Sequence, residues 1–336
     1  MMVKPCTLSW RIIKLKALKG RFPNNQPLWP SIAMEYTNRV NGYKGEKSLD
    51  FYLDQLSQTK YEIYHDLRLF DGKYYFQIDT FVQCTGFQLV IESKNRRGEI
   101  KFERGFQQTT LKINNHTKRI ANPVLQAKQQ ALKLKKWLQE HNCKELPTRF
   151  LFVNSKEETL IVADPDHELA PHIVNSEGLL EKISQMANYY KENNIDKKDL
   201  RKIKNLLLTN HTPDNPDILQ EFHVNPKNIL PGVRCPQCKT LSMYYRDGKW
   251  HCQDCNTTSK DAHEQAIYEY FLLINPSITN SELRKFLQLQ SRKVAHKLLT
   301  SMKLPFTGEK KSRIYHQPPL EHFHELLSEK IDLEDA

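Results

Sequence analysis

Residues 75–94 have the sequence Tyr75-Phe-Gln-Ile-Asp-Thr-Phe-Val-Gln-Cys-Thr-Gly-Phe-Gln-Leu-Val-Ile-Glu-Ser-Lys94. Aromatic and β-branched residues dominate 75–84 and again 87–94, which predicts two β-strands. Thr85-Gly86 lies between them and predicts a tight turn. We therefore expect an antiparallel hairpin at this point, and the rest of the domain is interpreted outward from it.

Three charged residues interrupt these apolar strands: Asp79, Glu92 and Lys94. Glu92 and Lys94 are two positions apart, so they share one face of their strand, and the hairpin can bring Asp79 alongside them. Charges inside apolar strands are costly unless they are paired or bind a metal. Two carboxylates can hold Mg²⁺ (or Mn²⁺), and a lysine can orient a water for attack. These parts suffice for phosphodiester hydrolysis. The alternative is a structural role, which is the commoner one for the bare Asp-x₁₂-Glu-x-Lys pattern.

The flanking pattern predicts an α/β domain with a mixed sheet flanked by helices. The expected helices are 32–56, 123–141, 176–190 and 199–208, and the expected further strands are 61–70, 99–102, 149–153 and 160–163. We expect 99–102 to continue the sheet that contains the hairpin. Asn122-Pro123 opens the second helix, because proline is favoured in the first turn.

Glu46 precedes Leu49 by three residues and Leu53 by seven, so it shares the apolar face of the first helix. A carboxylate aimed at the sheet favours a third acidic group at the same site. The alternative is a glutamate placed near a helix N-terminus by the helix dipole.

Residues of about 4–200 resemble the NERD (nuclease-related) domain of bacterial proteins. The matching stretches are Gly42-Tyr-Lys-Gly-Glu-Lys-Ser-Leu-Asp50, Tyr64-His-Asp-Leu-Arg-Leu69, Phe76-Gln-Ile-Asp-Thr80, Ile91-Glu-Ser-Lys-Asn95 and Asn122-Pro-Val-Leu-Gln126. The resemblance implies the restriction-endonuclease-like fold of the PD-(D/E)XK superfamily.

The same resemblance implies roles for individual residues. Asp79, Glu92 and Lys94 take the catalytic positions, and Glu46 is the helix-borne acid. Gln126 is similar to a helix glutamine that some members place beside the site; otherwise it is an exposed helix residue. For His65 in the first strand, a structural hydrogen bond is favoured over a role as general base.

Composition predicts a nucleic-acid partner. The chain has 336 residues and a net charge of +11, which suggests two or three domains and a polyanionic ligand. Cys6, Cys84 and Cys143 are scattered, so we expect a reducing compartment rather than a disulfide framework. No apolar run reaches a membrane span and no signal-peptide pattern is present, so we expect a cytoplasmic protein.

Cys235, Cys238, Cys252 and Cys255 form two CxxC pairs separated by thirteen residues. This spacing is typical of a Cys₄ zinc ribbon with a structural role. The intervening stretch is long enough for a hairpin that brings both pairs together. His251 is not expected to be a ligand, because four thiolates already close a tetrahedral site.

After the ribbon we expect three helices, of which the second is short and the third basic. Capping-box patterns at Asp261…Glu264 and Thr279…Glu282 mark the first two starts. The third helix has Arg292, Lys293 and Lys297 outside its apolar face. A short second helix and a basic third helix suggest helix-turn-helix binding in the major groove, followed by a small wing. The alternative is a generic three-helix bundle.

The expected domains are a nuclease-like domain at 1–208, a linker at 209–231, the zinc ribbon at 232–260, the helical DNA-binding domain at 261–318 and an acidic tail at 319–336. The favoured function is a metal-dependent DNA nuclease. A catalytically inactive DNA-binding or regulatory protein is the second reading and an RNA nuclease the third. A homo-oligomer is left open.

Overall fold

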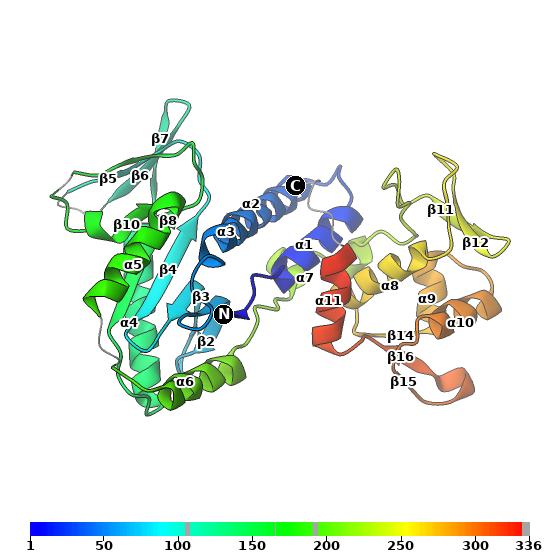
Figure 1. The fold of residues 1–336 in the computed structure, drawn as a ribbon. Coiled ribbons are helices and arrows are strands. Elements are labelled where there is room, and N and C mark those ends of the chain that lie inside the picture. The colour runs from blue at the N-terminus through cyan, green and yellow to red at the C-terminus, as the bar shows by residue number, and fades with distance from the viewer. Residues whose placement is uncertain (105–107, 165, 191–193, 331–336) are drawn as a thin grey trace. The chain divides into compact units, whose positions relative to one another are not determined.

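The computed structural model describes residues 1–104, 108–164, 166–190 and 194–330 (Figure 1). They form two compact units. The first contains Met1–Thr7 and Val40–Asp214, and the second contains Leu8–Arg39 and the chain from Asn215 onward. The sequence analysis placed 1–208 in one domain, whereas the structure groups Leu8–Arg39 with the C-terminal part of the chain.

The first unit is built on a six-stranded mixed sheet, as predicted. Its strand order is β1-β2-β3-β4-β8-β10. The strands are β1 (Met2–Lys4), β2 (Glu62–Phe70), β3 (Tyr75–Gln83), β4 (Gln88–Lys94), β8 (Thr148–Asn154) and β10 (Ile173–Asn175). β2, β3 and β4 pair antiparallel, and the remaining pairs are parallel. The central hairpin at Thr85-Gly86 is therefore confirmed.

Both faces of this sheet are buried. Val90 packs in a cluster with Leu134 of α4 (Pro123–Glu140) and Ile203 of α6 (Lys197–Asn210). The next residue, Ile91, packs in a second cluster with Leu53 of α3 (Asp50–Leu53) and with α5 (Leu179–Tyr189). Successive strand residues point to opposite faces, so a run of apolar residues serves two helical layers.

A smaller sheet begins directly after β4. Its order is β7-β6-β5-β9, formed by β5 (Glu99–Phe102), β6 (Thr109–Ile113), β7 (His116–Ile120) and β9 (Leu160–Val162). The expectation that 99–102 continues the main sheet is therefore wrong. Gly98, with φ 101°, turns the chain away before β5 begins. Asn114 and Asn115, both with positive φ, form the β6–β7 turn that the sequence analysis missed.

The second unit is mainly helical. Its helices are α1 (Trp10–Arg21), the first part of α2 (Trp29–Ser48), α7 (Ile218–Glu221), α8 (Ala262–Leu273), α9 (Asn280–Leu287), α10 (Arg292–Ser301) and α11 (Leu320–Lys330). Phe323 of α11 packs against Trp10 and Tyr268. The expected linker contains α7 and the expected tail contains α11, while residues 331–336 lie outside the described part.

Two three-stranded sheets complete the second unit. One has the order β11-β12-β13 and the other β14-β16-β15. Their strands are β11 (Met243–Arg246), β12 (Lys249–Cys252), β13 (Thr258–Ser259), β14 (Ser277–Thr279), β15 (Phe306–Thr307) and β16 (Ile314–His316). Short 3₁₀ turns lie at η1 (Ala170–His172) and η2 (Ser176–Gly178) in the first unit and at η3 (Pro226–Asn228) and η4 (Lys310–Ser312) in the second.

The two expected capping boxes have different outcomes. At α9 both reciprocal bonds between Thr279 and Glu282 are present. At α8 the box is wrong, because Asp261 makes no side-chain cap bond. The hydroxyl of Ser259 accepts from the backbone of Ala262 instead, at 2.9 Å.

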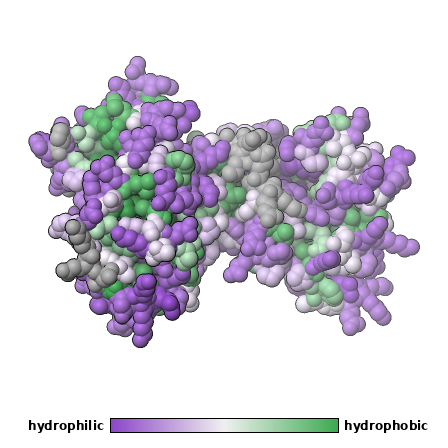
Figure 2. Space-filling model, viewed as in Figure 1, coloured by the Kyte–Doolittle hydropathy of each residue, from purple (hydrophilic) through white to green (hydrophobic). Residues whose placement is uncertain are grey.

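Hydrophilic side chains cover much of the face seen in Figure 2. Among the described residues, no helix combines the length and the apolar character needed to cross a membrane.

Candidate functional site

Three carboxylates lie at one level across three adjacent strands of the main sheet. Asp79 is on β3, and the strand registers place Asp66 of β2 and Glu92 of β4 on either side of it. Directly opposed residues of neighbouring strands are close together. The central hairpin therefore brings Asp79 and Glu92 together, as predicted, and adds an acid that the sequence analysis did not assign.

The backbone is unusual at this level. Asp66 has a φ of 51°, a left-handed conformation that is uncommon for a residue with a side chain. Tyr64 and Leu67 pack in the same core cluster although they are three positions apart, so the strand's alternation shifts at Asp66. On β3, Ile78 and Phe81 show the same shift around Asp79.

Lys94 lies between the two predicted acids. Its ammonium donates to Glu92 Oε1 and lies 3.9 Å from Asp79 Oδ2. The backbone N–H of Ser93 donates to Asp79 Oδ2 at 3.1 Å. This hydrogen bond does not depend on which side chain residue 93 carries. Glu92 is only 7% exposed. The structure thus brings Asp79, Glu92 and Lys94 into one cluster.

Glu46 joins this cluster electrostatically from the last turns of α2. Burial, followed by the charges of Asp79 and Asp66, raises its pKa to about 9. Burial and Asp79 raise the pKa of Glu92 to about 7. Burial lowers the pKa of Lys94, but Asp79 and Glu92 outweigh it and hold that pKa above its ordinary value. The site therefore concentrates negative charge in a poorly solvated place.

Lys4 and Gln77, which the sequence analysis did not assign, lie close to Asp66. The ammonium of Lys4 donates to the carbonyl of His65 at 2.7 Å and lies 4.0 Å from Asp66. Gln77 donates to Asp66 Oδ1 at 2.6 Å. Burial raises the pKa of Asp66, Lys4 opposes this, and Asp79 adds to it. The sequence could have indicated Asp66 as a site residue, because it interrupts an apolar strand just as Asp79 does.

His65 is fully buried and held on both ring nitrogens. Its Nδ1 lies 3.0 Å from the hydroxyl of Thr80, and its Nε2 lies 2.9 Å from Asp50 Oδ1. Burial alone would raise the pKa of Asp50, but hydrogen bonds from His65 and Lys47 lower it. These contacts agree with the structural role expected for His65.

Gln126 lies half-buried in the first turn of α4, which Asn122 caps by accepting from two backbone amides. Within the described ranges, no hydrogen bond joins the Gln126 side chain to the acidic cluster. Its role beside the site remains a prediction.

The four cysteines of the second unit converge. Their sulfur atoms all lie within 4.8 Å of one another, with Cys235 and Cys255 3.6 Å apart and Cys238 and Cys252 3.5 Å apart. In the described part of the chain, no other group of three or more His, Cys, Asp or Glu side chains is as compact. The cluster lies beside the β11–β12 hairpin, which turns at Asp247-Gly248 with φ of 49° and 82°.

The two CxxC turns repeat the same backbone geometry. The N–H of Cys235 donates to the carbonyl of Thr240 at 2.8 Å, and the N–H of Cys252 donates to that of Thr257 at 2.9 Å. The residue after each pair, Lys239 or Asn256, has a positive φ.

The thiols also have hydroxyl neighbours that favour thiolates. A hydrogen bond from Ser242 outweighs burial and lowers the pKa of Cys252 to about 6, whereas burial raises that of Cys235 to about 11. Thr257 lowers the pKa of Cys255. Four converging cysteine sulfurs are the ligand set of a structural zinc site, and the nearby hydroxyl groups donate hydrogen bonds to such ligands. His251 stacks on Tyr244 instead, in agreement with its expected exclusion.

Arg292, Lys293 and Lys297 are all exposed on α10. Gln288, with φ 58°, ends α9 and makes the turn that separates it from α10. The cations therefore lie outside the helix's buried face, which contains Ala295 and Leu299.

Residues 41–155 match the family model described as "Nuclease-related domain" (NERD). The comparisons with curated proteins and with solved structures found no match. The matched segment contains Glu46, Asp66, Asp79, Glu92 and Lys94, and it ends just after β8. Residues 41–155 therefore form a nuclease-related NERD domain.

Proposed function

We propose that this protein is a metal-dependent nuclease that hydrolyses DNA phosphodiester bonds, with Asp79, Glu92 and Lys94 at its centre. The observation that carries the proposal is the convergence of these three side chains with Glu46 inside a nuclease-related domain. All four side chains can carry a charge, and burial at this place makes an unpaired charge costly. Such an arrangement is typical of a catalytic site.

The donor set fits a hard divalent cation. Asp79 and Glu92 would hold Mg²⁺ or Mn²⁺, with Glu46 nearby, because all three offer carboxylate oxygens, which Mg²⁺ prefers. Burial, and after it repulsion from Asp79, raises the pKa values of Glu46 and Glu92, and a bound cation would relieve the repulsion. The bound metal would supply a water of lowered pKa and neutralise charge on the phosphate.

The chain's own residues would orient the reactants. The Ser93 N–H fixes one oxygen of Asp79 and leaves the other free to bind a ligand. The Lys94 ammonium can position the attacking water and attract the phosphate, because it lies beside both acids. Glu46 can hold a proton near neutral pH, given the direction of its pKa. Gln126 is proposed to lie beside the site.

We further propose that the second unit binds DNA. We take the order α8, β14, α9, α10, β15, β16 as support for a winged helix-turn-helix, in which α10 would enter the major groove. Arg292, Lys293 and Lys297 are the exposed cations that support this proposal. The four-cysteine cluster would hold a structural zinc that stabilises the segment beside α8.

Cleavage assays test the nuclease proposal directly. Wild-type protein is incubated with plasmid, linear and single-stranded DNA and with RNA, in Mg²⁺, Mn²⁺ or EDTA. Asp79→Ala should lower the rate at least ~100-fold, because the metal's contribution is worth several kcal/mol. Lys94→Ala should lower it to a similar extent, because the attacking water loses the group that positions it. DNA affinity should largely survive, since other phosphate contacts supply most of it.

Asp54→Ala and Lys73→Ala serve as matched controls, because both side chains are exposed and lie outside the acidic cluster. Both controls should cleave like wild type. If wild-type protein cleaves nothing with any metal, the inactive DNA-binding reading replaces ours, and cleavage of RNA alone favours the third. If both site variants cleave normally, the chemistry lies elsewhere.

A further inference from the structure

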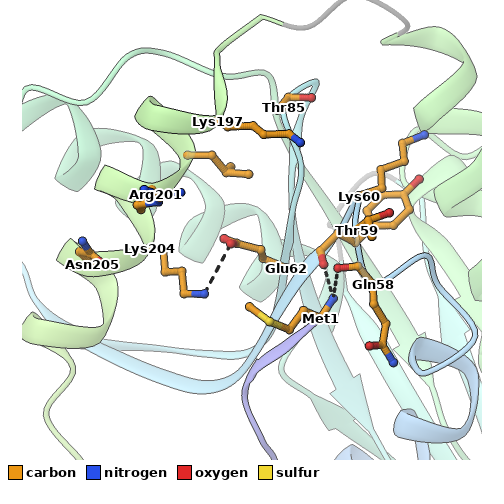
Figure 3. Close-up of a pocket in the computed structure, with 12 residues that line it drawn as sticks. Met1, Gln58, Thr59, Lys60, Glu62, Thr85, Lys197, Arg201, Lys204 and Asn205 are labelled. Atoms are coloured by element: carbon orange, nitrogen blue, oxygen red, sulfur yellow. Dashed lines mark hydrogen bonds and ion pairs between the residues drawn. The ribbon is translucent and has the colours of Figure 1, made fainter.

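A pocket of 620 Å³ lies in the first unit between the start of β2 and helix α6 (Figure 3). One wall comes from 58–62, at and before the first residue of β2, and the other from α6. Its lining includes Lys60 and Glu62 on the first wall and Lys197, Arg201 and Lys204 on the second. This volume is within the range of small-ligand sites.

Cations dominate the lining of this pocket. Lys197, Arg201 and Lys204 follow one another at i, i+4 and i+7 of α6, so they form a stripe on one face of the helix. Lys60 stands on the opposite wall, and Glu62 is the one acidic side chain among the described residues of the lining. Cations on both walls attract an anion with more than one charge.

Most of this charge is not neutralised by the protein. Lys204 lies 3.7 Å from Glu62, the ion pair drawn in Figure 3. Glu62 is itself held by the hydroxyl of Tyr64 and the amide of Gln83, both at 2.9 Å. Within the described residues, no ion pair includes Lys60, Lys197 or Arg201. Lys197 and Arg201 therefore remain for a ligand, whereas the ammonium of Lys60 lies over the ring of Tyr61, 5.2 Å from its centroid.

The pocket is separate from the acidic cluster. Glu62 and Asp66 are four positions apart on β2, which corresponds to about 13 Å along a strand. An anion bound by α6 is therefore not the phosphate that water would attack beside the carboxylates, although both sites lie in the same compact unit.

We propose that this pocket binds a phosphate group of a nucleic-acid strand, away from the bond that is cleaved. The pocket's anion chemistry comes from its own cations, and the choice of nucleic acid as the source rests on the proposed function. Lysine and arginine in a groove are the usual means of tracking a strand's backbone.

The test compares two double variants of the same helix. Lys197→Ala/Arg201→Ala removes two of the three cations of the stripe and leaves Lys204. Lys198→Ala/Lys202→Ala removes the same charge from α6 outside the pocket lining. Binding of a fluorescein-labelled single-stranded DNA is measured against salt, without added divalent cation so that nothing is cleaved. Circular dichroism verifies that each variant is folded.

The pocket variant should lose about 1.4 from the salt slope, since each contact with a single strand contributes about 0.7. This corresponds to about 25-fold weaker binding at ~0.1 M salt, if affinities converge near ~1 M. The control pair should change the slope less. Glu62→Gln should have the opposite sign and tighten binding, because it removes the acid beside Lys204.

Equal slopes for the two double variants would overturn the proposal. So would loss of inorganic phosphate binding with DNA binding unchanged, because the ligand would then be a free anion. Asp54→Ala, outside both the pocket and the acidic cluster, should bind DNA like wild type in this assay. A protein that fails to cleave yet shows the pocket effect contradicts the proposed catalysis and leaves the pocket assignment standing.

Discussion

Replacing Glu46 by glutamine should stabilise the metal-free first unit, and increasingly so as the pH rises. Glu46 is largely buried beside Asp66, Asp79 and Glu92, and its pKa is raised from 4.5 to about 9. A raised pKa means that the folded state binds the proton more tightly than the unfolded state. Ionising Glu46 therefore costs folding free energy, and a neutral glutamine of similar shape avoids that cost.

The magnitude follows from the pKa shift. Below pH 4.5 the side chain is protonated in both states, so glutamine and glutamic acid differ little. Between pH 4.5 and about 9 the wild type should lose ~1.4 kcal/mol of unfolding free energy per pH unit relative to the variant. The difference should be on the order of 3 kcal/mol at pH 7 and should level off above pH 9.

The assay is urea unfolding near pH 5, 7 and 9 without divalent cations. Pulsed hydrogen exchange with mass spectrometry of β2–β4 peptides follows the first unit alone, since a global signal would mix the transitions of the two compact units. Glu181→Gln on the exposed face of α5 is the matched control, because it makes the same chemical change away from the cluster. Its unfolding curve should track the wild type at every pH.

A pH-independent difference between Glu46→Gln and wild type would refute the electrostatic reasoning. A destabilised variant would refute it more strongly, because it would mean that the Glu46 carboxylate makes favourable contacts that outweigh its burial. Either result would remove the main argument that Glu46 belongs to the acidic cluster.

Two further predictions concern the second unit. Purified protein should contain one zinc per chain, and zinc-free wild type in elemental analysis would contradict this. Cys252→Ser should release the zinc and unfold the ribbon, because structural zinc contributes on the order of 10–16 kcal/mol to the folding of small fingers. Hydrogen exchange in the first unit should stay unchanged. Replacing Arg292, Lys293 and Lys297 by alanine should weaken duplex DNA binding and lower its salt slope by up to about 2.7, whereas an unchanged slope would make α10 a scaffold.

The parts of the fold that depend on neighbouring residues were predictable. The β3–β4 hairpin follows from two apolar runs around Thr85-Gly86, and the buried face of α4 follows from its helical spacing. The same local reasoning brought Glu92 and Lys94 to one face, and the turn between the strands brought Asp79 beside them. Cysteine spacing sufficed for the four-thiol cluster, because the two turns and the hairpin between them are local structures.

Features that depend on distant contacts were not predictable in this way. Leu15 and Leu18 are fully buried, yet nothing near them in the sequence indicates that α1 packs with segments more than two hundred residues later. The Asp261…Glu264 pattern satisfied the residue rule of a capping box, but Asp261 has φ −123° and ψ 0° rather than the extended backbone that such a cap needs. The spacing of residue types cannot supply that backbone angle.

Asp66 shows how the two limits meet at the candidate site. Its charge inside an apolar strand was visible in the sequence, but its relation to Asp79 depends on the β2–β3 register, and its φ of 51° depends on the whole sheet. In a regular strand, successive side chains before and after Asp66 would alternate between the two faces of the sheet. Leu67 would then face away from the core cluster that contains Tyr64. Because both β2 and β3 shift here, the core resumes beyond the acids without a change of register. The irregular level therefore admits three carboxylates into the sheet while the apolar packing continues on both sides of them, and such local strain is commonest at functional sites.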